Sequence, residues 1–543
     1  MSLRSTESRE SSTNGEQKTT YFDVHKPVFW PSLVLILTMI VTTLSLGDQA
    51  AEMFSTIQSF ISNSFGGMFI LSVSGFLVFS LFIAFSKLGH IRLGGRDATP
   101  NFSTSAWFAM LFSAGMGIGI MFWSVAEPIY HYLSPPMAQG ETVEAAREAM
   151  SLSYLHWGFH AWGIYAVVAL SLAFFAFNKG LPLSFRSVFY PILGDRIEGW
   201  MGDVVDTLAV LATLFGLATS LGLGVRQVSA GFDYLFGVGS GLYTQVALIG
   251  GITAVATLSV VLGIDKGVRV LSEANIRIAV FFLLFILVVG PTIYIFDSFV
   301  QNMGHYFNNI FRYSLWTESY ADSSWQNSWT VFYWAWWISW SPYVGMFIAR
   351  ISKGRTVREF ILGVLIVPSI VTFLWLAAFG GSAINLEMMG VGNIGAMVQQ
   401  DYATALFAML EQFPLSMVTS MVAIVLVMSF FVTSSDSGSL VIDSLTSGGK
   451  LDAPVGQRVF WAITEGAVAA VLLIGGGLEA LQTAAITTGL PFMFILVVMC
   501  YSVYIGLREE HQKKVERSKK KERESYRELI SDLLQRRQDK NAE

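Results

Sequence analysis

The sequence Trp334-Ala335-Trp336-Trp337-Ile338-Ser339-Trp340 places four tryptophans within seven residues, inside a long apolar segment. The segment begins near Trp325 and ends at the basic residues Arg350, Lys353 and Arg355. A helix rises about 1.5 Å per residue, so the segment would span roughly 38 Å, with the indoles near its centre. Tryptophans that anchor a membrane helix lie at its ends. Because these indoles lie near mid-membrane, we interpret them as a cage of aromatic rings for a quaternary ammonium group.

The composition indicates an integral membrane protein. Hydrophobic residues make up 53% of the 543 residues, charged residues make up 13%, and the mean hydropathy is +0.54, whereas a soluble domain usually carries about 25% charged residues. The net charge of −5 is too small to suggest a nucleic-acid partner. Cys500 is the single cysteine, which excludes an intrachain disulfide and any cysteine-based metal cluster.

Twelve apolar runs are long enough to cross a bilayer as helices. They are 28–46, 66–86, 104–133, 150–177, 204–232, 241–263, 275–299, 325–350, 357–380, 413–434, 457–476 and 481–506. Lys and Arg gather in alternate connections between these runs. The positive-inside rule then places those connections and both termini in the cytoplasm. The even number of runs agrees with that orientation.

The polar segments divide the chain further. We predict a disordered cytoplasmic tail over 1–26, peripheral helices 1–2 over 27–100, helices 3–7 over 101–300, an outer amphipathic helix over 301–324, helices 8–12 over 325–507 and a charged cytoplasmic tail over 508–543. The spacing of Glu, Lys and Arg in the last segment favours a solvated helix. Contact of that helix with anionic lipid or a neighbouring subunit is an open alternative.

Ser113-Ala114-Gly115-Met116-Gly117-Ile118-Gly119 interrupts the third run with three alternate glycines. Each glycine costs a helix about 1 kcal/mol relative to alanine, so three together favour local unwinding. Unwound backbone within a bilayer must face protein or a water-filled cavity, and many transporters bind substrate and sodium at such breaks. Close packing of helices through small residues is the alternative interpretation.

The fourth run carries aromatic and histidine side chains that are further candidates. Trp162 and Tyr165 share a helix face and, with Trp157, are candidates for binding, with core packing as the alternative role. His156 and His160 have the i, i+4 spacing of a metal-binding pair. No Glu or Cys completes a site around this pair, so we expect no metal there.

The tenth run ends in Phe430-Phe431-Val432-Thr433-Ser434-Ser435-Asp436-Ser437. Hydroxyls and freed carbonyls at a helix end suit Na⁺, although Ser and Thr in membrane helices often bond the carbonyl four residues earlier. Few ionisable groups lie within the runs, and we interpret them as candidates for gating or ion-pair roles: Glu127, Asp206, Arg226, Asp436 and Glu465. The glycine stretch contains no carboxylate, which disfavours a proton relay through it.

These three stretches together resemble the betaine/choline/carnitine transporter family, specifically its sodium-coupled glycine betaine type. The resemblance extends over all twelve runs. It implies an all-α membrane protein with two peripheral helices and a ten-helix core of two inverted five-helix repeats, the LeuT-like fold of the amino-acid/sodium symporters. It also implies a homotrimer.

The resemblance assigns a role to each matching residue. It implies a substrate site that contains Trp334, Trp336, Trp337, Trp340, Trp157, Trp162, Tyr165, Ala114, Met116 and Gly119. Within that site, Trp337 would stack on the substrate cation, and the backbone near Ala114 and Met116 would meet its carboxylate. One sodium would bind the carbonyls of Ser113, Met116 and Phe430 and the hydroxyls of Thr433 and Ser434. A second sodium would lie near Tyr165, Thr213, Ser220 and Tyr343.

Two positions depart from the pattern expected for the second sodium. Leu217 stands where the family would have a hydroxyl, and Tyr343 stands where it would have phenylalanine. Gly119 bears on the substrate, because proton-coupled choline transporters carry an aspartate in this glycine stretch. A cation gains from that carboxylate and a zwitterion does not, so Gly119 favours glycine betaine. Thr433 and Ser434 argue against the sodium-independent carnitine exchangers.

We therefore predict a secondary transporter that takes up glycine betaine, or a related zwitterion, with Na⁺ by alternating access for osmoprotection. Choline, carnitine, ectoine, proline and dimethylsulfoniopropionate, with proton or sodium coupling, are alternative substrates, because a sulfonium stacks on indoles much as an ammonium does. No metal, nucleophile or cofactor constellation is complete, so we do not expect an enzyme. An osmosensor or a channel-like protein is the alternative of another class.

The expected setting is a bacterial plasma membrane, which is the inner membrane in a Gram-negative cell. The predicted partners are the small zwitterionic substrate, Na⁺ as the coupling ion and membrane lipids. We expect no cofactor and no nucleic acid.

Overall fold

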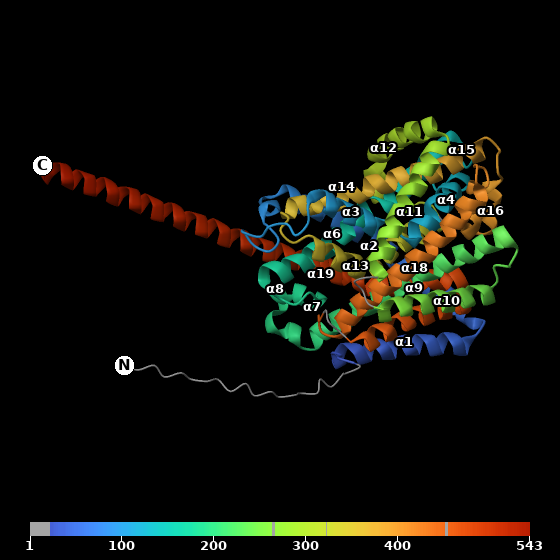
Figure 1. Ribbon diagram of the computed structural model, residues 1–543, viewed down its shortest axis with the longest axis horizontal. Helices are drawn as coiled ribbons and strands as arrows, with labels where there is room; N and C mark the ends of the chain where they lie inside the picture. The colour runs from blue at the N-terminus through green and yellow to red at the C-terminus, as the bar shows by residue number, and fades with distance from the viewer. Residues whose placement is uncertain (1–21, 263–266, 322, 451–453, 543) are drawn as a thin grey trace, which may run out of the picture.

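The computed structural model describes residues 22–262, 267–321, 323–450 and 454–542, and within these ranges the chain forms helices joined by short connections, with no strand. The helices gather into one bundle, and the end of the last helix projects from it (Figure 1). The predicted all-α membrane fold is confirmed. Most of the predicted tail 1–26 lies outside the described residues.

The longer helices correspond closely to the predicted apolar runs. They are α1 Lys26–Leu46, α2 Gln49–Phe85, α3 Thr104–Gly115, α4 Ile118–Leu133, α5 Val143–Trp157, α6 Phe159–Lys179, α9 Trp200–Phe236, α10 Leu242–Leu262, α11 Gly267–Val289, α12 Thr292–Ser314, α13 Phe332–Ile351, α14 Val357–Leu376, α18 Ser416–Thr446 and α19 Val455–Ala542. Shorter helices connect them: α7 Phe185–Val188, α8 Tyr190–Leu193, α15 Ser382–Met388, α16 Ile394–Gln400 and α17 Ala405–Leu410.

The number of membrane spans depends on how interrupted helices are counted. Within the described residues, nine helices are long and apolar enough to cross a membrane, and α3 with α4 forms a tenth such unit that is bent by 62°. The tryptophan-rich α13 is not among them. The helix α19 counts once, although Gly476 and Gly477 within it have non-helical backbone angles. The number of twelve spans therefore stays a prediction.

Local sequence explains where several helices begin and end. Gly180 (φ 69°) and Gly237 (φ 65°) end α6 and α9 in the left-handed conformation that glycine adopts without steric cost. At the start of α14, the Thr356 hydroxyl accepts the Glu359 backbone N–H, while the Glu359 carboxylate accepts the Thr356 backbone N–H. This reciprocal pair satisfies two donors that a helix start would otherwise leave free.

The outer helix differs from its predicted bounds. The helix α12 begins at Thr292 and ends at Ser314, whereas the sequence predicted a span to residue 299 and an amphipathic helix over 301–324. Gly290 and Pro291 separate α11 from α12, because proline cannot continue the hydrogen bonding of a preceding helix. Over the predicted tail 508–543, α19 continues as a helix to Ala542, and its side chains are exposed over 512–539.

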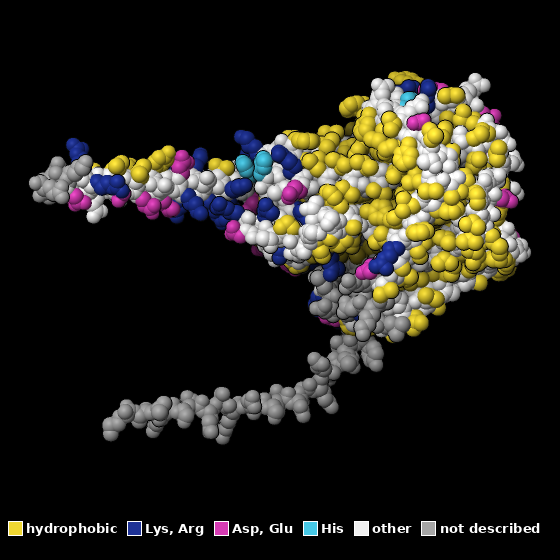
Figure 2. All heavy atoms as spheres, turned by 45° about the horizontal axis from the view of Figure 1, so that its top comes forward, with side chains coloured by type: hydrophobic (Ala, Val, Ile, Leu, Met, Phe, Trp, Pro, Cys, Tyr) yellow, Lys and Arg dark blue, Asp and Glu magenta, His cyan; other side chains and the backbone are white. Residues whose placement is uncertain are grey.

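The helix α13 lies in the core of the bundle, where it packs against α6, α9 and α19. Small residues permit this close approach. A Cβ atom on Gly345 would lie 2.3 Å from Val168 Cγ1, and one on Gly216 would lie 3.0 Å from the Ser339 backbone. The face of the bundle in view in Figure 2 is largely hydrophobic, while acidic and basic side chains gather along the projecting end of α19. The tryptophan helix is thus surrounded by protein.

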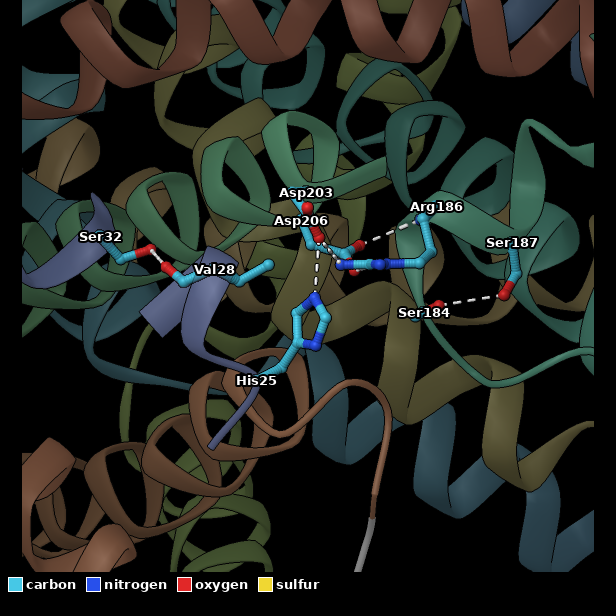
Figure 3. A network of polar contacts seen from close by, with 8 residues as sticks. All are labelled: His25, Val28, Ser32, Ser184, Arg186, Ser187, Asp203 and Asp206. Carbon is cyan, nitrogen blue, oxygen red and sulfur yellow. Dashed lines mark hydrogen bonds and ion pairs between the residues drawn. The ribbon is translucent and has the colours of Figure 1, made fainter. Parts of the chain in front are cut away.

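A polar network fixes the start of α1 against α7, α9 and α18 (Figure 3). The imidazole of His25 lies 2.7 Å from Asp203 Oδ1, and the His25 backbone N–H donates to the Thr446 carbonyl at 2.7 Å. Arg186 Nε donates to Asp206 Oδ2 at 2.5 Å, and Arg186 Nη2 donates to Asp203 Oδ1 at 2.9 Å. Of the two roles considered for Asp206, the structure therefore favours the ion pair.

Candidate functional site

The glycine stretch breaks the third span between α3 and α4. The helix α3 ends at Gly115, Met116 and Gly117 have extended backbone, and α4 starts at Ile118. The Ser113 carbonyl accepts the Met116 N–H at 3.3 Å. The predicted unwinding is present in the structure, and it places the end of one short helix beside the start of the next.

The start of α4 presents free backbone N–H groups. Gly117 provides no side-chain cap, and the first backbone bond of this helix runs from the Met121 N–H to the Gly117 carbonyl at 3.4 Å. The preceding N–H groups lack an intrahelical acceptor, and the helix dipole makes this end positive. Residues 117–120 line a cavity, so this end of α4 offers donors to an anionic group within it.

Six aromatic residues, which we term the aromatic cage, surround that cavity: Trp157, Trp162, Tyr165, Trp336, Trp337 and Trp340. Trp337 lies at the centre of the cage. Its ring is stacked on Trp336 with centroids 4.7 Å apart, and it meets the Trp157 ring edge-on at 4.9 Å. Tyr165 lies 6.4 Å from Trp337, and Trp162 lies 5.3 Å from Tyr165. Rings from α5, α6 and α13 thus converge on one point.

The first cavity brings together most of the predicted substrate residues. Besides the aromatic cage, it is lined by Ala114 and Gly119. A Cβ atom on Gly119 would lie 2.9 Å from Trp336 Cη2 and 3.1 Å from Trp157 Cη2. The first cavity has a volume of only about 30 Å³, so its lining must move apart to admit anything much larger than a few waters. Gly119 is therefore a packing partner of two cage rings.

Two predicted substrate residues lie elsewhere. Met116 lines a second cavity beside the first. Trp334 does not line either cavity, and its ring is stacked on the imidazole of His160 with centroids 5.6 Å apart. The contact with His160 thus accounts for the position of the Trp334 ring outside the lining of the two cavities.

Several buried donors within the cage have no acceptor. The indole N–H groups of Trp336 and Trp340 and the hydroxyl of Tyr165 have no hydrogen-bond partner among the described residues. A buried polar group without a partner costs about 1–3 kcal/mol. Together with the N–H groups of α4, these donors are suited to an acceptor such as a carboxylate.

The five residues predicted for the first sodium all line the second cavity, of about 230 Å³: Ser113, Met116, Phe430, Thr433 and Ser434. Ala114, Trp340 and Ser434 line both cavities, which places the two side by side. The Thr433 hydroxyl lies 3.1 Å from the Ser429 carbonyl and 3.2 Å from the Phe430 carbonyl. The contact with Ser429 is the hydrogen bond to the carbonyl four residues earlier, which the sequence analysis gave as the alternative to sodium binding.

The residues predicted for a second sodium are not gathered around one cavity. Ser220 and Tyr165 line the first cavity and Tyr343 lines the second. Thr213 lines neither, and its hydroxyl donates to the Ala209 carbonyl in the same helix at 2.7 Å. Leu217 packs against Gly438, where a Cβ atom would lie 2.2 Å from Leu217 Cδ1.

Three polar lining residues were not found from the sequence: Thr372, Ser272 and Asn275. Thr372 of α14 lines the first cavity, and Asn275 of α11 lines the second, where its amide Nδ2 lies 3.3 Å from the Thr433 hydroxyl. Asn275 could have been found as a polar residue within an apolar run. Thr372 carries no such signal, because a single threonine is common in membrane helices.

Comparison with known proteins gives a consistent result. A model of the family described as BCCT, betaine/carnitine/choline family transporter, matches residues 27–512. The chain is 51% identical over 499 residues to Glycine betaine transporter 1 of Vibrio parahaemolyticus, which covers 90% of this chain and 95% of that protein. It is 50% identical over 501 residues to a glycine betaine/proline/choline/ectoine transporter of the same species, over 90% and 88% of the two chains. A glycine betaine transporter of Acinetobacter baylyi is 46% identical over 490 residues, which cover 90% of this chain and 74% of that protein.

Proposed function

Since the chain belongs to the betaine/carnitine/choline transporter family, we propose that it takes up glycine betaine together with Na⁺ by alternating access. The aromatic cage would hold the quaternary ammonium group, as aromatic faces attract such cations by about 0.5–2 kcal/mol each. The carboxylate would accept hydrogen bonds at the start of α4. The expectation of a transporter is confirmed by the family, while substrate and coupling ion are part of this proposal.

The observation that carries the proposal is the presence of two chemically different kinds of group in one cavity. Aromatic rings line this cavity, while the start of α4 and the unpartnered donors of Trp336, Trp340 and Tyr165 offer hydrogen bonds. A zwitterion with an onium group and a carboxylate uses both sets. A simple cation such as choline leaves the anion-binding end of α4 without an anion.

The second cavity supports sodium coupling. It contains the carbonyl-bearing end of α3 at Ser113 and Met116, together with the hydroxyl groups of Thr433 and Ser434. The negative end of a helix dipole and neutral oxygens suit a monovalent cation. A zwitterion carries no net charge, so the membrane potential cannot drive it alone, whereas each Na⁺ adds about 2.3 kcal/mol per 100 mV.

Movement of α3, α4 and α13 relative to α9 and α18 would alternate access to the cage. The second cavity extends from the cage as far as Arg350, Leu440 and Val441. Under the positive-inside rule this is the cytoplasmic side, which also holds both termini. We further propose a homotrimer in a bacterial plasma membrane.

The name of one relative supports a broader substrate range as a second candidate. That relative is described as a transporter of glycine betaine, proline, choline and ectoine, and half of its aligned residues are identical to those of this chain. Proline and ectoine also carry a carboxylate, so they too would use the donors at α4. Choline would not.

The decisive experiment is uptake into proteoliposomes with labelled glycine betaine, proline, ectoine and choline. We expect saturable glycine betaine uptake that requires an inward Na⁺ gradient, with choline the poorest substrate. Uptake that proceeds equally well in K⁺ or choline chloride would rule out sodium coupling. A channel-like protein would instead give uptake that does not saturate and does not concentrate the substrate.

A further inference from the structure

A buried carboxylate lies beside the aromatic cage and accepts several hydrogen bonds. Glu127, on α4, has no solvent exposure. Its Oε2 accepts the Trp157 indole N–H at 2.7 Å and the Tyr333 hydroxyl at 2.5 Å. Its Oε1 lies 2.7 Å from His156 Nδ1 and 3.4 Å from His131 Nε2. We term these five residues the Glu127 cluster.

The cluster fixes two rings of the cage. Trp157 lines the first cavity and is held directly by Glu127. Trp337 is held by Glu127 indirectly, through His156. The Trp337 indole N–H donates to the backbone carbonyl of His156 at 2.8 Å, and the His156 ring is hydrogen-bonded to Glu127. Thr330 holds the other ring nitrogen of His156 at 2.9 Å. Glu127 therefore links α4, α5 and α13 at the edge of the substrate site.

The same three groups, Glu127, His131 and His156, offer ligand atoms that all lie within 4.8 Å of one another, which raises the question of a metal site. The Glu that completes this group comes from α4, which the sequence analysis of the His156 pair did not anticipate. Two ligands of a tetrahedral zinc lie about 3.3 Å apart, whereas His156 Nδ1 and Glu127 Oε1 are at hydrogen-bond distance, 2.7 Å. The other carboxylate oxygen already accepts two donors, so the geometry is that of a hydrogen-bond network.

We propose that Glu127 is a positioning residue of the substrate site: a buried anion that orients Trp157 directly and Trp337 through His156. A buried carboxylate is costly unless it accepts several hydrogen bonds, and Trp157 and Tyr333 supply two of them here. Because the rings of a cation cage must face the substrate at a set angle, loss of this anchor weakens substrate binding although Glu127 does not touch the substrate. The proposal rests on the proposed function of the cage.

The test compares the kinetics of Glu127→Gln with those of wild type in proteoliposomes. The amide keeps the size of the side chain but places N–H groups against the donors of Trp157 or His156. We expect KM for glycine betaine to rise at least about tenfold, with the maximal rate changed less than about twofold at equal protein content. Tyr333→Phe removes one donor and leaves the charge, so its KM should rise less. The KM of Glu127→Asp, which keeps the charge, should lie between the KM of Glu127→Gln and that of wild type.

A matched control separates this role from a general loss of folding. Glu148 is a second buried glutamate, on α5, and its carboxylate accepts the Met137 backbone N–H at 2.9 Å. Glu148→Gln should therefore leave KM unchanged. Quenching of tryptophan fluorescence by glycine betaine gives a second readout, and its midpoint should shift with KM in the Glu127 and Tyr333 variants but not in Glu148→Gln.

Three results would overturn the proposal. A wild-type KM in Glu127→Gln would show that the cage does not need the anchor, and a lower maximal rate at unchanged KM would assign Glu127 to a conformational step. Stoichiometric zinc in the purified protein, with uptake lost on chelation and restored by zinc, would make the cluster a metal centre. If wild type itself fails to transport or bind glycine betaine, the proposed function fails first, and the fluorescence titration distinguishes that case.

Discussion

The indole N–H of Trp337 donates to the backbone carbonyl of His156 at 2.8 Å. This bond joins α13 to α5, and the Trp337 side chain lines the first cavity. Trp336 covers one side of that ring at 4.7 Å, and the Trp157 ring meets it at 4.9 Å. The position of the central indole is therefore set by a backbone acceptor as well as by its neighbours.

Replacement of this ring should remove the principal binding face. We expect Trp337→Leu to abolish saturation over the glycine betaine concentrations at which wild type saturates, since loss of one desolvated cation–π contact costs roughly 2 kcal/mol, or about thirtyfold in affinity. Labelled uptake at equal amounts of membrane protein provides the measurement. Trp334→Phe is the matched control on the same helix, because Trp334 faces His160 outside the cavity. Normal uptake by Trp337→Leu would contradict the cage assignment.

The Thr433 hydroxyl is the clearest test of the sodium assignment. Thr433→Ala should raise the Na⁺ concentration for half-maximal uptake by at least about fivefold, because one oxygen ligand is lost. The Na⁺ dependence of initial rates at fixed substrate measures this. Thr213→Ala should leave that curve unchanged, since Thr213 lines neither cavity. A shift of the Na⁺ curve in Thr213→Ala would support the second sodium site. An unshifted curve in Thr433→Ala would contradict the first.

Gly119 should be intolerant of even one methyl group. A Cβ atom there would lie 2.9 Å from Trp336 and 3.1 Å from Trp157. Overpacking of this kind costs about 1–3 kcal/mol, so Gly119→Ala should raise KM by about tenfold or more. Gly75→Ala in α2, where a Cβ atom meets nothing within 4 Å, is the control for a glycine change in a membrane helix. An unaltered KM for Gly119→Ala would show that the rings of Trp336 and Trp157 can shift to accommodate the methyl group without loss of binding.

The network at the start of α1 should matter for stability. Asp206 is buried and pairs with Arg186, so Asp206→Asn leaves a nearly buried guanidinium without its main counter-charge. Removal of one partner from a buried ion pair costs about 3–5 kcal/mol. We expect a lower Tm in detergent by tryptophan fluorescence. The exposed pair Arg147–Glu144 provides the comparison, since Glu144→Gln should shift Tm little. Equal Tm values for the two variants would argue against this role of Asp206.

Much of this arrangement could be predicted from the sequence, because it rests on local patterns. Apolar runs predicted the helices, alternate glycines predicted the break at Met116 and Gly117, and four tryptophans near the middle of one run predicted an aromatic cage. The resemblance added the partners on other helices, Trp157 and Thr433 among them. These residues meet as expected at the two cavities, while their roles stay predictions.

Contacts between distant segments could not be predicted in this way. Nothing local indicates that Glu127 accepts hydrogen bonds from Trp157 and Tyr333, which lie 30 and 206 residues away. The sequence likewise gave Trp334 the same weight as its neighbours, although its ring packs against His160. Helix rotation within the bundle decides such contacts, and it depends on side-chain packing that periodicity does not specify.

The break at Met116 and Gly117 places opposite helix ends back to back. Ser113 and Met116, at the end of α3, line the second cavity, and residues 117–120, at the start of α4, line the first. Under the proposed assignment, Na⁺ and the zwitterion would therefore bind on either side of one break in the helix. Binding of either one would stabilise the backbone conformation that the other binds. Thermodynamic reciprocity then requires that Na⁺ tighten glycine betaine binding by the same factor by which glycine betaine tightens Na⁺ binding.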